Sequence, residues 1–218
     1  MPVLRLILLF AVLVFLVTFV QLGIVTIAFE KLGLSQDAAY LLLLATLAGS
    51  MINLPLFSIA AEPPPDLPPQ QEIYRLLGVP GLPYKGRTVI AINVGGAITP
   101  VAFSLYLIQH YPLDPLQVVG VVAIVAAIAH RASTPIRGVG ICMPMLLAPL
   151  AAALISILLN PELAAPLAYI GGTLGVLIGA DLLHLGSIRK LGSPIASIGG
   201  AGSFDGIFLS GMLAVLLA

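Results

Sequence analysis

The chain has 218 residues, of which 60% are hydrophobic and 8% are charged, and its formal net charge is zero. Globular domains in water have about 25% charged residues, so this composition excludes an ordinary soluble fold. There is no basic stretch long enough to indicate nucleic acid as a partner. We therefore expect an all-α, polytopic helical membrane protein whose surroundings are the lipid bilayer.

A transmembrane helix needs about 20 apolar residues, and on this measure we count seven candidate membrane spans, of which the fourth is short for a full crossing. The first is too long for the apolar region of a signal peptide, and we interpret it as an uncleaved span. The fourth is the shortest of the seven. The predicted spans are residues 3–29, 38–60, 88–108, 116–129, 138–159, 166–185 and 195–218.

The basic residues predict the orientation of these spans. If the N-terminus is cytoplasmic, eight of the nine Lys and Arg residues lie on the cytoplasmic side, as the positive-inside rule requires. This pattern predicts a multi-pass protein of the cell membrane with a cytoplasmic N-terminus. The eight residues are Arg5, Arg75, Lys85, Arg87, Arg131, Arg137, Arg189 and Lys190, and Lys31 is the exception.

The chain divides into three predicted regions. Residues 1–60 form the first two spans, residues 61–87 form a proline-rich cytoplasmic loop, and residues 88–218 form a five-helix core. Five prolines between Pro63 and Pro69 favour extended polyproline II conformation, so we interpret this loop as a stiff linker.

The third predicted span contains the sequence INVGGAITP, in which Asn93, two glycines and Pro100 interrupt the apolar run. One interpretation is a broken helix that exposes backbone carbonyls to a cavity. The other is a kink with tight packing, and the sequence leaves both open. Asn93 is a candidate for binding a substrate or an ion.

The last two predicted spans each carry one acid, Asp181 and Asp205. An acid at the centre of a membrane helix costs about 2.5 to 3.5 kcal/mol on insertion scales, so it is first considered as a functional group. His184 follows Asp181 by three residues and is predicted to share its face. We include His184 and Ser203 as candidate substrate- or ion-binding residues.

Both spans also carry small residues at a spacing of four. Gly171, Gly175 and Gly179 form one such ridge, and Gly202, Gly206 and Ser210 form the other. Ridges of this kind let a second helix backbone approach closely. Asp181 is predicted to face away from the ridge of its own helix.

The two acids are predicted to meet, because a short turn joins their antiparallel helices and their depths are about 6 and 12 Å. Two adjacent carboxyl groups cannot both ionise easily and share a proton. In aspartic peptidases, one such group activates water and the other protonates the leaving group. Asp181 and Asp205 are therefore our candidate catalytic residues.

Two short sequences resemble motifs of intramembrane aspartyl proteases of the presenilin and signal-peptide-peptidase type. GADLLHL contains Asp181, and GAGSFDGIFLSG contains Asp205. Ala180 stands where those families have Tyr, and Phe204 stands where they have Gly. The resemblance implies hydrolysis of a transmembrane peptide.

A longer stretch, from Asn93 onwards, resembles a prokaryotic membrane family known as domain of unknown function sixteen-fourteen. The resemblance rests on INVGGAITP, STPIRGVGICMP, YIGGTLGVLIGADLLHL and SPIASIGGAGSFDGIFLSG. It implies a multi-pass membrane protein and no particular activity.

Two other functions remain open at this point. Broken helices around carboxylates bind protons or cations in many carriers, and Asn93, Asp181, His184 and Asp205 could form such a site. Alternatively, the acids are structural, with Asp181 paired to His184 or Arg189. We predict no cofactor and no metal site, and the sequence does not define the oligomeric state.

Overall fold

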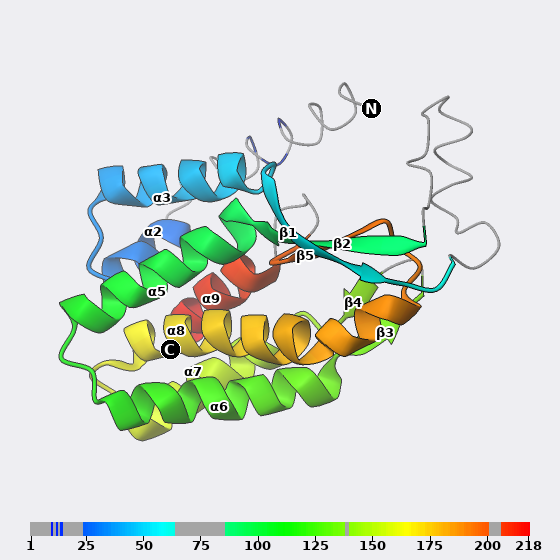
Figure 1. The fold of residues 1–218 in the computed structure, drawn as a ribbon. Helices are drawn as coiled ribbons and strands as arrows, with labels where there is room; N and C mark the ends of the chain where they lie inside the picture. Colours follow the sequence, from blue (N-terminus) through cyan, green and yellow to red (C-terminus); the bar gives the residue numbers. More distant parts are fainter. Residues whose placement is uncertain are drawn as a thin grey trace.

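A continuous helical rod, Ala164–Lys190, forms the centre of the computed structural model (Figure 1). It consists of α8 (Ala164–Val176), the π-helix η2 (Leu177–Asp181) and the 3-10 helix η3 (Leu182–Lys190). The structure describes residues 10, 12, 14, 24–63, 86–137, 140–200 and 206–218. The helices packed most extensively against α8 are α5 (Thr99–His110), α6 (Pro115–Ala132), α7 (Leu147–Leu159) and α9 (Gly206–Leu217).

Two helices in the described part of the chain are long and apolar enough to cross a membrane. They are α6 and the rod Ala164–Lys190, which correspond to the fourth and sixth predicted spans. Asp114 begins α6 by accepting a hydrogen bond from the backbone N–H of Leu116, and Pro115 occupies the first turn. The expectation of a mainly helical chain with membrane-spanning helices is confirmed to this extent.

The glycine ridge of α8 and η2 packs against α6, as its spacing predicted. A Cβ atom at Gly171 would lie 2.6 Å from Val121, and one at Gly175 would lie 2.7 Å from Val125. At Gly179, a Cβ atom would clash with the backbone of Ala126. Only glycine permits this approach, so the ridge fixes how the two longest helices meet.

The N-terminal part of the described chain covers the opposite side of the helical core. Here α2 (Ile24–Lys31) contacts α8 and α9, and α3 (Gln36–Gly49) contacts α5. Phe29 and Leu43 belong to the same buried apolar cluster as Phe103 of α5. Most of the first predicted span, residues 3–29, lies outside the described residues.

A small sheet occupies one end of the molecule, where the sequence predicted helices (Figure 1). Its strands are β1 (Asn53–Ala60), β2 (Arg87–Asn93) and β5 (Ile195–Ile198), in the order β1-β2-β5. The pairing of β1 with β2 is antiparallel and that of β2 with β5 is parallel. The prediction of an all-α chain is therefore wrong in parts of the second, third and seventh predicted spans.

The residues of β1 and β2 favour extended backbone over helix. Pro55 has no backbone N–H and cannot continue α3, and it lies at an irregularity of the edge strand β1. In β2, Thr88, Val89, Ile90 and Ile92 are β-branched, which favours extended backbone. Short apolar runs do not distinguish a buried strand from a buried helix, so periodicity alone could not separate them.

The fifth predicted span also begins differently from the prediction. A two-stranded hairpin, β3 (Thr134–Ile136) with β4 (Gly140–Cys142), occupies its start. Helix α7 begins only at Leu147, after Pro144. Most of the predicted loop, residues 64–85, lies outside the described residues.

Candidate functional site

Asp181 lies where the central rod changes its helical type. It is the last residue of η2 and directly precedes η3, and its side chain is partly buried. Its Oδ2 atom accepts a hydrogen bond of 2.7 Å from the backbone N–H of Gly199. π-helical turns in proteins are often found at functional sites. The carboxylate therefore joins the sixth predicted span to the start of the seventh.

The turn that supplies this donor needs glycine. Gly199 and Gly200 have φ values of +82° and +90°, a region that other residues rarely adopt. A Cβ atom at Gly199 would also lie 2.7 Å from the backbone of Ala97 in the π-helix η1 (Val94–Ile98). The glycine turn is thus packed between η1 and the carboxylate of Asp181.

Asn93 connects this turn to the N-terminal helices. Its side chain is 1% exposed, and its Oδ1 accepts a hydrogen bond of 2.7 Å from the N–H of Gly96. Its Nδ2 donates to the carbonyl of Ser50 at 2.8 Å and to Oδ1 of Asn53 at 3.0 Å. Ser197 donates to the same Oδ1 of Asn53 at 2.5 Å.

The sequence INVGGAITP was compatible with a broken helix or with a kink and tight packing. The structure combines the two, because regular structure is interrupted there and the chain is also tightly packed. Strand β2 ends at Asn93, η1 follows, and α5 begins at Thr99. A Cβ atom at Gly95 would clash with the backbone of Thr46 and Ser50. Both amide hydrogens of Asn93 are used within the protein, so it acts as a structural brace and leaves no donor for a ligand.

His184 has other partners than Asp181. Its Nδ1 lies 3.1 Å from the carbonyl of Gly179, and its ring lies 4.4 Å, between centroids, from the ring of His130 on α6. His184 is buried, whereas His130 is exposed. In the described part of the chain, neither His184 nor Arg189 forms a hydrogen bond or ion pair with the Asp181 carboxylate, so the pairing that the structural alternative invoked is not present.

Asp205 and Ser203 lie outside the described residues, as does Gly202 of the second ridge. The residues on either side can be placed. Ile198 and Ile207 belong to the same buried apolar cluster as Leu177 and Ala180 of η2. Both ends of the segment that carries Asp205 therefore lie in the cluster that surrounds the helix of Asp181.

No group of three or more potential metal ligands occurs within the described ranges. Analysis of the sequence missed Asn53, Ser197 and the backbone of Gly199 as parts of this site. The Gly199-Gly200 pair after a short apolar run was the available signal, since it indicates a turn with positive φ.

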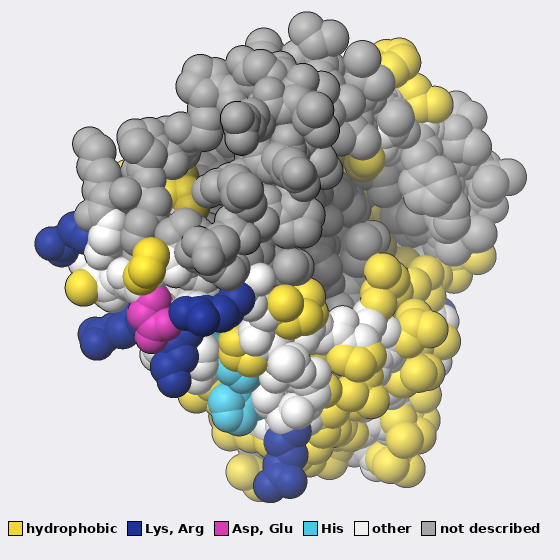
Figure 2. All heavy atoms as spheres, turned by 90° about the vertical axis from the view of Figure 1, so that its right-hand side faces the viewer, with side chains coloured by type: hydrophobic (Ala, Val, Ile, Leu, Met, Phe, Trp, Pro, Cys, Tyr) yellow, Lys and Arg dark blue, Asp and Glu magenta, His cyan; other side chains and the backbone are white. Residues whose placement is uncertain are grey.

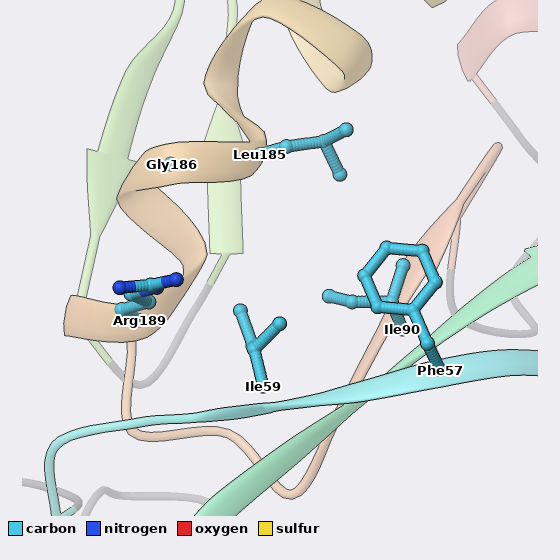
Figure 3. Close-up of a pocket in the computed structure, with 6 residues that line it drawn as sticks. All are labelled: Phe57, Ile59, Ile90, Leu185, Gly186 and Arg189. Carbon is cyan, nitrogen blue, oxygen red and sulfur yellow. The ribbon is translucent and has the colours of Figure 1, made fainter.

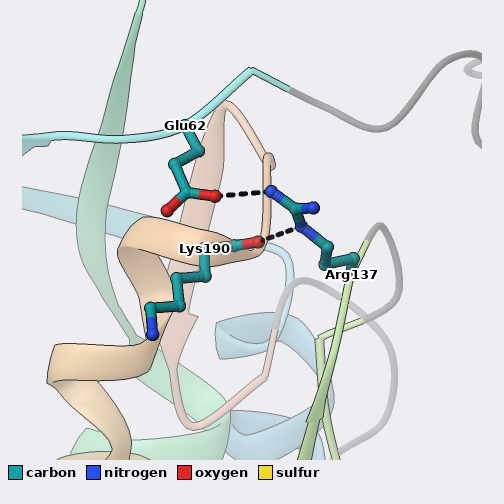
Figure 4. A network of polar contacts seen from close by, with 3 residues as sticks. All are labelled: Glu62, Arg137 and Lys190. Atoms are coloured by element: carbon teal, nitrogen blue, oxygen red, sulfur yellow. Dashed lines mark hydrogen bonds and ion pairs between the residues drawn. The ribbon is translucent and has the colours of Figure 1, made fainter.

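A cluster of basic residues lies at the sheet end of the rod and consists of Arg87, Arg137, Arg189 and Lys190. Arg137 pairs with Glu62 at 2.5 Å and donates a hydrogen bond of 3.0 Å to the carbonyl of Lys190 (Figure 4). The N–H of Glu62 donates to the carbonyl of Arg189. Figure 2 shows Lys and Arg side chains gathered around acidic atoms on this face, beside an extended hydrophobic surface.

These features define a mainly helical protein that has two helices of membrane-spanning length and an acid at an irregular helix junction. Residues 47–217 match the model of a family described as a protein of unknown function (DUF1614), and the chain belongs to this family. The match includes both Asp181 and Asp205. No curated protein and no solved structure matches the chain, so no likeness to presenilin-type proteases is shown.

Proposed function

We propose that the chain is an integral membrane protein that hydrolyses membrane-embedded peptides with a pair of carboxyl groups, Asp181 and Asp205. The observation that carries this proposal is the hydrogen bond from Gly199 to Asp181. It holds the entry to the seventh predicted span against the first acid. Only five residues lie between Gly199 and Asp205 in the sequence, and Ile207 lies in the same cluster as Ala180.

The surface supports a location in the bilayer. Large apolar side chains point outward on α6 and α7, including Leu116, Val119, Leu154 and Leu158, which are 60 to 77% exposed. An apolar surface that extends over several helices is unfavourable in water and typical of contact with lipid or a partner. Our proposal includes seven crossings, with the N-terminus and the basic cluster on the cytoplasmic side.

The chemistry follows from the hydrogen bonds of Asp181. The N–H of Gly199 orients Oδ2 and stabilises its negative charge, while Oδ1 forms no hydrogen bond to any described residue. Oδ1 is then the atom that shares a proton with the second carboxyl group. The ionised group accepts a proton from the attacking water, and the protonated group donates one to the leaving nitrogen.

Transport is the second candidate, and the broken helices favour it. The π-helix η2 interrupts the central rod at Asp181, η1 joins strand β2 to α5, and the turn at Gly199 lies between them. In many carriers, irregular backbone beside an intramembrane carboxylate binds a proton or cation. In that case Asp181 would take up the ion directly.

The test uses purified protein in liposomes with a fluorogenic transmembrane peptide. We expect cleavage by the natural sequence and a loss of at least about a hundredfold in Asp181→Asn and Asp205→Asn. Asparagine keeps the acceptor for the Gly199 N–H, so the fold should remain. In the double variant the loss should not be multiplied, because the two groups act as a unit.

Asp114→Asn is the matched control, since Asp114 caps α6 and should leave cleavage unchanged. If proton or cation flux depends on Asp181 and no cleavage is found, the result would favour the carrier function over the hydrolase function. Full cleavage by folded Asp181→Asn protein would exclude the acid pair altogether.

A further inference from the structure

An open cavity of about 340 Å³ lies between η3 and the sheet, near the basic cluster (Figure 3). Phe57 and Ile59 of β1 form one wall, and Ile90 of β2 forms the floor. The other wall is η3, which contributes Leu185, Gly186 and Arg189. Figure 3 shows the guanidinium group of Arg189 at the edge of this apolar space.

Arg189 differs from its basic neighbours in its bonding. Arg87 donates to the hydroxyl and the carbonyl of Ser58, at 3.1 and 3.2 Å, and Arg137 pairs with Glu62. In contrast, the guanidinium group of Arg189 makes no hydrogen bond or ion pair to any residue that the structure describes. It is therefore the arginine of this cluster that is available to an anion.

We propose that this cavity binds an anionic phospholipid, with the phosphate on Arg189 and part of an acyl chain against Phe57, Ile59 and Leu185. A guanidinium group binds phosphate through two parallel hydrogen bonds. The apolar walls gain stability when a chain covers them, which inorganic phosphate cannot do. Basic pockets beside membrane helices on the cytoplasmic side bind anionic headgroups in this way.

This site is separate from the acid pair. It depends on the location of the protein in a bilayer, but it does not depend on hydrolysis or transport. Lipid binding can therefore fail while peptide cleavage persists, and the reverse is also possible.

The absence of tryptophan from the chain permits a direct measurement. Phe57→Trp introduces a single tryptophan at a half-exposed position of the cavity wall, and its emission can be excited selectively over that of the tyrosines. The protein is reconstituted in phosphatidylcholine vesicles that contain brominated phosphatidylglycerol or brominated phosphatidylcholine, and quenching gives the relative affinity. We expect phosphatidylglycerol to be preferred by about fivefold, the contribution of one Arg near a membrane surface.

Two variants in the Phe57→Trp background test the parts of the site. Arg189→Gln should abolish the preference, and Arg189→Lys should retain part of it. Gly186→Phe should reduce quenching by both lipids, because nothing lies within 4 Å of the position that its Cβ would occupy and the ring can enter the cavity.

Two matched controls complete the experiment. Arg131→Gln removes an exposed charge that does not line the cavity and should leave most of the preference intact. Gly120→Phe places the same ring at another open helical glycine and should leave quenching unchanged. Equal quenching by the two lipids in the Phe57→Trp protein without further changes, or a preference that survives Arg189→Gln, would overturn the proposal.

Discussion

Glycine brings backbones together in two parts of this molecule, and the two contacts are built in different ways. Where the rod Ala164–Lys190 meets α6, the glycine ridge receives valine side chains and the adjoining backbone is helical. Where η1 meets the turn at Gly199, a strand gives way to a π-helix and the opposing chain turns with positive φ.

This difference explains why polar side chains bond to backbone N–H groups at the second contact. Regular helices satisfy their own backbone groups, so the contact with α6 needs only a matching shape. At the irregular contact, the N–H groups of Gly96 and Gly199 donate hydrogen bonds to the side chains of Asn93 and Asp181 instead of to backbone carbonyls. The candidate site thus lies where regular structure ends.

The largest expected effect comes from adding one methyl group to a glycine that faces the backbone of another helix, either Gly179 in the contact with α6 or Gly95 where η1 meets the end of α3. Gly95→Ala and Gly179→Ala should each lower the free energy of unfolding by about 3 kcal/mol or more, because each Cβ would meet backbone atoms that cannot move aside. The measurement is unfolding in detergent micelles, followed by circular dichroism.

Gly120→Ala is the control for these variants. Its Cβ would enter open space on α6, so the substitution should stabilise the helix by about 0.5 to 1 kcal/mol. If Gly179→Ala were as stable as Gly120→Ala, the close approach of η2 to α6 would be wrong.

A smaller effect is expected at the turn beside Asp181. Gly199→Ala should lower the free energy of unfolding by about 2 to 3 kcal/mol. The added Cβ both strains the backbone at positive φ and comes too close to Ala97. Gly86→Ala has a similar φ of +72° but open space around it, so it should show the backbone strain alone, about 1 kcal/mol.

The difference between these two variants in thermal unfolding isolates the contact with η1. Gly199→Ala should also reduce peptide cleavage, because it displaces the donor to Asp181, whereas Gly86→Ala should not. Equal losses of stability would show that the turn is not packed against η1.

The smallest of the three effects is expected at the polar brace. Asn93→Ala should cost about 2 kcal/mol, because it leaves the buried N–H of Gly96 and the carbonyl of Ser50 without a partner. Asn160→Ala removes two longer hydrogen bonds, of 3.2 and 3.4 Å, at a less buried site and should cost less than about 1 kcal/mol. Urea unfolding of both variants compares them, and equal costs would show that Asn93 is not a brace.

Some features of the fold could be predicted from residues that are close in sequence. The long apolar runs predicted α6 and the central rod, and the spacing of Gly171, Gly175 and Gly179 predicted that another helix would pack closely against the rod. The resemblance that begins at Asn93 predicted the family. The pairing of Asp181 with Asp205 stays a prediction.

Other features could not be predicted, because they depend on partners that are distant in the sequence. Strand β2 pairs with β1 and β5, in which Asn53 lies opposite Asn93 and Ile195 lies opposite Val89. The residues of β2 are compatible with a helix or a strand when considered alone. The partner of Asp181 is likewise a backbone N–H eighteen residues away.

The sequence by itself determined the mainly helical character of this protein and its two longest helices, because apolar length and small-residue spacing act within one segment. Only the tertiary structure decided that apolar runs near Asn53, Asn93 and Ile198 become strands, since a strand needs backbone partners from other segments. The same long-range pairing brings the glycine turn to Asp181 and leaves the guanidinium of Arg189 beside an apolar cavity.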